Sequence, residues 1–141
     1  MNNQQTIESL AGVLPVIQLP FLTDESIDWD TFSCEIDWAY ENGAHGIVAA
    51  MVTEILRLTD AERDELAVRM VKYNAGRGPV VMSIGDESTV QAVRHARSAA
   101  EAGVDGLILV SAGAGGHAGN LNPLALMAEV KQVFNKTILL A

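Results

Sequence analysis

The chain has 141 residues, of which 49% are hydrophobic and 19% are charged, and its formal net charge is −9. This composition is typical of a globular protein rather than a disordered segment, and the negative charge argues against binding of nucleic acid or of an anionic membrane. One cysteine, Cys34, excludes an internal disulfide and a cysteine-based metal site. We see no export signal and no apolar run long enough for a membrane span, so we expect a cytoplasmic protein.

Five apolar runs recur along the chain at intervals of roughly thirty residues, the size of a βαβ unit. We expect strands at residues 13–19, 46–50, 79–84, 107–110 and 137–141. The amphipathic stretches between them predict four helices. The alternation indicates an α/β protein with a parallel sheet covered by helices. Either an open doubly wound sheet or part of a (β/α)8 barrel would fit, and the pattern alone does not decide between them.

Local signals mark the ends of the four helices. We expect the first helix at residues 28–42, followed by Gly43. Capping boxes at residues 59–62 and 88–91 predict the starts of the second and third helices, and Gly76 and Gly103 predict their ends. Asn122 followed by Pro123 predicts the start of the fourth helix.

Residues 12–110 resemble the dihydrodipicolinate synthase / N-acetylneuraminate lyase family. The resemblance is carried by Pro20-Phe21, Gly46-Ile47-Val48, Leu58-Thr59, Glu62-Arg63, Ser88-Thr89 and Ala102-Gly103-Val104-Asp105, among other short matches. It implies a partial (β/α)8 TIM barrel with about four βα units and the start of a fifth strand. The length of the chain predicts a single domain over residues 1–141. The resemblance also implies a carbon–carbon lyase of the class I aldolase type, which binds an α-keto acid as a Schiff base and needs no cofactor.

The chain departs from that family at its substrate loop. Where the family has Gly-Thr-Thr-Gly-Glu, this chain has residues 50–54, and the relay hydroxyl is replaced by Val52. By the resemblance, Thr53 and Glu54 remain as substrate-binding residues, although Glu54 could equally cap the following turn. A Schiff-base lysine must project from a strand end with a pKa lowered by burial. All three lysines (Lys72, Lys131 and Lys136) fall in or just after predicted helices, so we expect this chain alone to be inactive.

Residues 106–141 resemble a second family, the FMN-dependent nitronate monooxygenases of the 2-nitropropane dioxygenase type. The resemblance rests on a glycine-rich loop around His117 and implies that His117 is a catalytic base acting on a nitronate. From the residues alone, His117 could instead be a solvated loop histidine. The loop glycines could bind the cofactor FMN through backbone N–H groups, or could form a flexible loop; they are Gly113, Gly115, Gly116 and Gly119. This interpretation places a junction of two family segments near residues 103–111.

A third hypothesis is a non-catalytic half barrel. Half a barrel leaves open sheet edges and an apolar interior face, so we expect a homo-oligomer. Among the remaining candidates, we expect His45 to be structural, His95 to be a solvated residue in the middle of a helix, and Cys34 to be inert. No carboxylate–histidine cluster has the spacing of metal ligands, so we predict no metal site.

Overall fold

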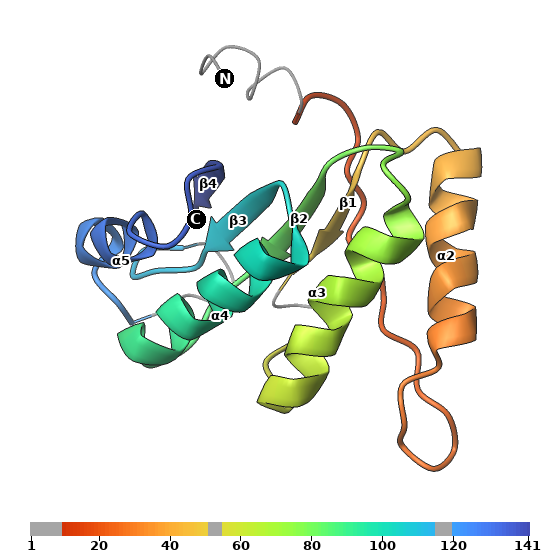
Figure 1. Ribbon diagram of the computed structural model, residues 1–141, viewed down its shortest axis with the longest axis horizontal. Coiled ribbons are helices and arrows are strands. Elements are labelled where there is room, and N and C mark those ends of the chain that lie inside the picture. Colours follow the sequence, from red (N-terminus) through yellow and green to blue (C-terminus); the bar gives the residue numbers. More distant parts are fainter. Residues whose placement is uncertain (1–9, 51–54, 115–119) are drawn as a thin grey trace.

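The computed structural model describes residues 10–50, 55–114 and 120–141. In chain order the elements are α2 (Trp29–Glu41), β1 (Ile47–Ala49), α3 (Asp60–Asn74), β2 (Val80–Ser83), α4 (Thr89–Ala102), β3 (Gly106–Leu109), α5 (Pro123–Val130) and β4 (Thr137–Leu140). Strands and helices therefore alternate as predicted, and Figure 1 shows this succession along the chain.

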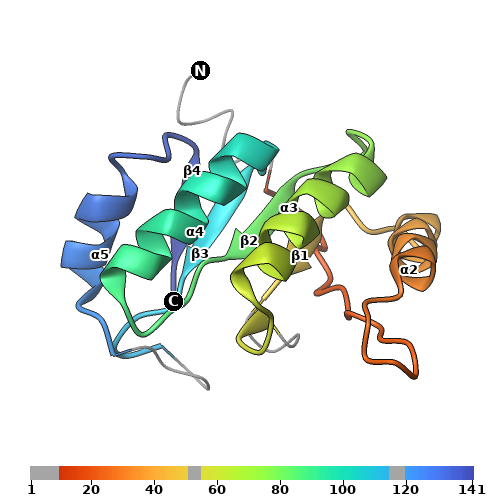
Figure 2. The same cartoon turned by 60° about the horizontal axis from the view of Figure 1, so that its bottom comes forward.

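The order of the strands in the sheet decides between the two α/β architectures. The four strands are parallel and neighbour one another in sequence order, β1-β2-β3-β4. Because crossovers between parallel strands are right-handed, an uninterrupted order puts every helix on one face of the sheet. Figure 2 shows α3 and α4 side by side on that face. A doubly wound sheet would reverse its order and place helices on both faces, so that alternative is wrong, and the fold is a partial barrel.

The first predicted strand, residues 13–19, is present only as an isolated bridge between Val16 and Val48. Two backbone bonds flank the bridge: Ile17 N donates to the carbonyl of Val48 at 3.0 Å, and Val48 N donates to that of Pro15 at 3.0 Å. Pro15 has no N–H to extend the ladder. The segment still lies beside β1, as the first strand of a barrel would, but the prediction of a full strand is wrong.

The predicted helix starts have different outcomes. At α3 the capping box is confirmed, because Thr59 N donates to Glu62 Oε2 at 2.8 Å and Glu62 N donates to Thr59 Oγ1 at 3.3 Å. At α5 the side chain of Asn122 accepts from the backbone as expected. The second capping box is wrong, since the Ser88 side chain makes no cap bond. Gln91 extends instead toward α3, where its Nε2 lies 3.4 Å from Asp60 Oδ2.

One hydrophobic core fills the space between the sheet and the helices, and alternate residues of each strand point into it. The strand residues in the core are Ile47, Ala49, Val80, Met82, Leu107 and Leu109. The core also includes residues from Ile17 to Phe134, so the proposed junction at residues 103–111 lies inside it rather than at a boundary.

Candidate active site at the carboxyl ends of the strands

The loops that follow the parallel strands gather at one edge of the sheet, the place where (β/α)8 barrels carry their active sites. Most of the predicted site residues lie in two of these loops and outside the described residues: Thr53, Glu54, Gly115, Gly116, His117 and Gly119. Gly113 is described. It follows β3 in a turn with φ +99°, a conformation that favours glycine. The loops that carry the candidate residues thus start from β1 and β3, with β2 between them.

Two buried serines lie at this edge of the sheet, and the sequence reasoning missed them. Ser83 is the last residue of β2 and Ser111 follows β3; both are at most 2% exposed. Ser83 alternates with Met82, which faces the helices, so its side chain is on the opposite, interior face. Ser111 Oγ donates to the Ala141 carbonyl at 3.0 Å. A hydroxyl at the end of an apolar run is the signal that could have identified both.

The side chain of Arg63 on α3 contacts the backbone of the loop after β2. The Arg63 guanidinium is buried; its Nη1 lies 3.4 Å from the Gly85 carbonyl oxygen and its Nη2 lies 3.5 Å from that of Ser83. Asp86 Oδ2 is 4.0 Å from Nη1. Burial lowers the pKa of Arg63, while Asp86 opposes that shift. The arginine therefore shapes the loop backbone through its carbonyl groups.

The prediction that His95 is solvated is wrong. The side chain is buried, with Nε2 3.5 Å from Asp86 Oδ2 and 3.8 Å from Asp60 Oδ1. The helix face that His95 shares with Ala92, Ala96 and Ala99 packs inward. Because these neighbours are small, they leave room for an imidazole between α4 and α3. Burial, followed by the charge of Arg63, lowers the pKa of His95.

Two other candidate side chains, His45 and Cys34, are structural and solvent-facing, respectively. His45 pairs with the first segment, since its Nδ1 accepts from Val13 N at 3.2 Å and its own N donates to the Val13 carbonyl at 2.8 Å. Cys34 is exposed on α2. Among the described residues, no group of three or more His, Cys, Asp or Glu side chains is arranged to hold a metal ion. None of the described helices is both long and apolar enough to cross a membrane.

All three lysines lie at the opposite edge of the sheet. Lys72 is in the last turn of α3, Lys131 is the residue after α5, and Lys136 immediately precedes β4. Helices in βα units run back toward the amino ends of the strands, so these positions share the amino-end side. The Lys136 Nζ donates to the carbonyls of Val104 and Gly103 at 2.8 and 3.2 Å, so it caps the end of α4 rather than being fully solvated.

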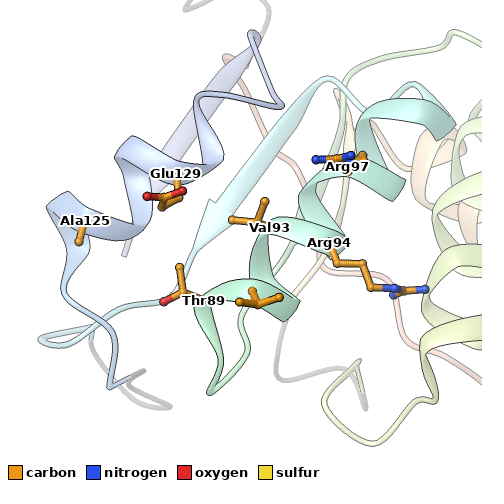
Figure 3. A pocket seen from close by; sticks show the side chains of 7 residues that line it. Thr89, Val93, Arg94, Arg97, Ala125 and Glu129 are labelled. Atoms are coloured by element: carbon orange, nitrogen blue, oxygen red, sulfur yellow. The ribbon is translucent and has the colours of Figure 1, made fainter.

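A separate groove of about 660 Å³ lies on the outer side of the molecule, between α4 and α5 (Figure 3). Val93 and Ala125 form part of its apolar wall, and Arg97 and Glu129 stand on opposite sides. Arg94 extends away from the groove toward α3, where it pairs with Asp64. The groove is therefore on the helix-covered face, whereas a barrel site opens at the strand ends.

Sequential parallel strands, helices on one face and loops gathered at the carboxyl edge define the class as a partial (β/α)8 barrel. The model of the dihydrodipicolinate synthetase family matches residues 9–112, and the chain belongs to that family. It is 36% identical over 103 residues to an uncharacterized DapA-like lyase of Halobacterium salinarum, and 33% identical over 103 residues to the 4-hydroxy-tetrahydrodipicolinate synthase of Methanococcus maripaludis. These matches cover 72% of this chain but only 34% and 35% of the relatives, so the chain spans about a third of their length.

Solved structures extend the similarity over nearly the whole chain. Dihydrodipicolinate synthase from Oceanobacillus iheyensis superposes with a TM-score of 0.83 at 20% identity, covering 99% of this chain and 46% of that one. The enzyme from Bacillus clausii gives a TM-score of 0.78 at 26% identity, covering 94% and 45%. The same fold thus accounts for the segment after residue 112. Nothing in these comparisons supports a nitronate monooxygenase segment, an FMN site or a junction of two families.

Proposed function

We propose that this chain supplies the α-keto acid-binding part of a family lyase site, with Thr53 and Glu54 as the substrate contacts. The support is the family membership together with the position of their loop, which leaves the carboxyl end of β1. The related sequences from Methanococcus and Methanoculleus carry the name 4-hydroxy-tetrahydrodipicolinate synthase. A small α-keto acid such as pyruvate is therefore the first substrate to test, and the reaction needs no cofactor.

The position of the lysines carries the second half of the proposal. A Schiff-base lysine has to reach the substrate at the carboxyl ends of the strands. Lys72, Lys131 and Lys136 lie on the amino-end side, and Lys136 is held there by two carbonyls. The proposed lyase therefore takes its lysine from outside these 141 residues.

Borohydride trapping tests both the binding of an α-keto acid and the location of the Schiff-base lysine. The native gene product, purified from its source, and the 141-residue chain are each incubated with pyruvate and sodium borohydride, and the adduct is mapped by peptide mass spectrometry. We expect an adduct in the native product, on a lysine outside residues 1–141, and none on the chain alone. An adduct on Lys72, Lys131 or Lys136 would contradict the assignment of the lysine. A native product of 15.0 kDa that forms no adduct with any α-keto acid would rule out the proposed lyase function.

Substitution at the loop after β1 tests substrate binding separately from catalysis. Thr53→Val removes the proposed hydroxyl, and Thr89→Val makes the same change at the outer groove. A hydrogen bond to a charged group is worth about 1.5–3 kcal/mol, so Thr53→Val should weaken pyruvate binding about tenfold or more, as measured by NMR titration. Equal affinities for the two variants would exclude Thr53 as a contact.

Self-association is a second candidate property, favoured by the edges of the sheet. β4 is at one edge of the described sheet, where Leu139 and Leu140 are 42% and 45% exposed. Exposed apolar edge strands tend to pair with another chain. In sedimentation experiments we expect the 141-residue chain to form a homo-oligomer that Leu139→Lys weakens. Leu124→Lys, at an exposed site on α5, should leave it intact. A monomeric wild-type chain would refute this candidate.

A further inference from the structure

The buried imidazole of His95 joins three elements behind the carboxyl end of β2. Its Nε2 points toward Asp86 of the β2–α4 loop, at 3.5 Å, and toward Asp60 of α3, at 3.8 Å. Its Nδ1 lies 3.3 Å from Arg94 Nη1. Arg94 in turn donates from Nη2 to Asp64 Oδ2 at 2.7 Å. The ring thus sits between two carboxylates on one side and a guanidinium on the other.

The Arg94 contact fixes the tautomer of His95. A guanidinium has N–H donors and no acceptor, so Nδ1 must accept the hydrogen bond with its lone pair. The neutral ring therefore carries its proton on Nε2, on the side of Asp60 and Asp86. The next proton could bind only at Nδ1, where Arg94 already donates. That proton would turn the hydrogen bond into a contact between two donors, each on a cationic group.

We propose that the protonation state of His95 controls how α3, α4 and the β2–α4 loop are held together. The neutral imidazole holds them through Arg94, Asp60 and Asp86, whereas protonation at Nδ1 breaks the hydrogen bond from Arg94, displaces the ring and loosens the loop that Asp86 ties to it. The charged groups around the ring are Asp60 and Arg63 on α3, Asp86 in the loop and Arg94 on α4. Asp64 of α3 pairs with Arg94.

Burial of the ring beside Arg63 explains why release, rather than tightening, follows protonation. The two carboxylates already face the Nε2 proton of the neutral ring. Protonation at Nδ1 therefore strengthens their attraction to the ring only through its added net charge. Against this, the cationic ring would be buried beside Arg63, which is itself only 4% exposed. Arg63 cannot turn away easily, because it contacts the carbonyls of Ser83 and Gly85. Burial, followed by the charge of Arg63, lowers the pKa of His95, and the opposing effects of Asp60 and Asp86 do not reverse that shift.

The test is an NMR pH titration of the imidazole resonances, combined with amide hydrogen exchange across residues 85–88. His95→Gln identifies the resonance and replaces the Nε2 donor with an amide that does not titrate. Arg94→Gln removes the opposing cation, and Arg97→Gln is the matched control on the same helix, in the outer groove. All readouts are spectroscopic, so they are independent of the proposed lyase function.

We expect His95 to titrate below the ordinary histidine value of about 6.5, with exchange at residues 85–88 rising in the same step. His95→Gln should abolish that rise. Arg94→Gln should raise the His95 midpoint, and Arg97→Gln should not move it. The inference is overturned if loop exchange stays constant through the His95 step, or if Arg94→Gln and Arg97→Gln titrate alike. If His95→Gln fails to fold, the two arginine variants decide the question.

Discussion

The hydroxyl of Tyr40 on α2 donates to Asn74 Oδ1 at the end of α3. Asn74 is buried, and its Nδ2 donates to the Gly78 carbonyl at 2.8 Å, on the approach to β2. The Arg77 guanidinium stacks over the Tyr40 ring at 4.5 Å from its centroid. Burial raises the pKa of Tyr40, so the phenol remains a proton donor at neutral pH. One buried amide thus connects two helices to the start of a strand.

Tyr40→Phe should destabilise the fold, because it leaves Asn74 Oδ1 buried without its donor. An unsatisfied buried acceptor costs about 1–3 kcal/mol in the free energy of unfolding. Urea denaturation measures the loss. Trp38→Phe, at a 63% exposed site on the same helix, serves as the control and should change stability by less than about 0.5 kcal/mol. Equal effects of the two variants would show that the amide is satisfied in another way.

Two small substitutions in the α3–β2 connection should change the free energy of unfolding in opposite directions. A Cβ at Gly78 would lie 2.1 Å from the His45 carbonyl oxygen, so Gly78→Ala must displace backbone and should cost several kcal/mol. Ala75, by contrast, is left-handed with φ 52°, and Ala75→Gly should relieve strain and gain a few tenths to about 1 kcal/mol. Thermal unfolding separates the cases, and a stabilising Gly78→Ala would refute the close approach.

The lowered pKa of His95 predicts how stability depends on pH. The unfolded chain binds a proton near pH 6.5, while the native state binds it only at a lower pH. Between these values the unfolded state holds more protons, so the free energy of unfolding falls as the pH drops from 6.5 toward the native pKa, and the His95 contribution is constant below it. Urea unfolding at pH 7.5 and 5.5 should show a smaller drop for His95→Gln. An equal drop would assign the pH dependence to other groups.

Core packing predicts a large effect at β3. Leu107 is fully buried in the cluster shared by sheet and helices, so Leu107→Ala should cost about 2–5 kcal/mol. Val90→Ala, at a 77% exposed site, should have little effect on the denaturation midpoint. Similar midpoints for the two variants would contradict the placement of Leu107 in the core.

Flavin binding provides a direct test of the unsupported alternative. Since one family accounts for the fold of the whole chain, we expect no saturable quenching of FMN fluorescence at high micromolar protein concentration. Saturable quenching that His117→Ala weakens would restore the nitronate monooxygenase hypothesis.

Periodicity and capping signals located the elements well, because they depend on local chemistry. The bounds of α2 follow from Asp28, whose side chain accepts from Thr31 N, and those of α3 from the Thr59–Glu62 box. Strand order could not be read from local pattern, since it arises from contacts between distant residues. His95 was misplaced for the same reason: its burial depends on α3 and on Asp86, which only the fold brings together.

The distribution of the lysines also decides how the molecule can be attached to a surface. Lys72, Lys131 and Lys136 are exposed, and all lie on the amino-end side of the sheet. Coupling to a sensor chip through the lysine side chains would therefore attach the protein by this side and turn the carboxyl ends of the strands toward the flowing solution. The position that makes these lysines unsuitable as Schiff-base residues makes them suitable attachment points for measuring ligand binding at the opposite edge.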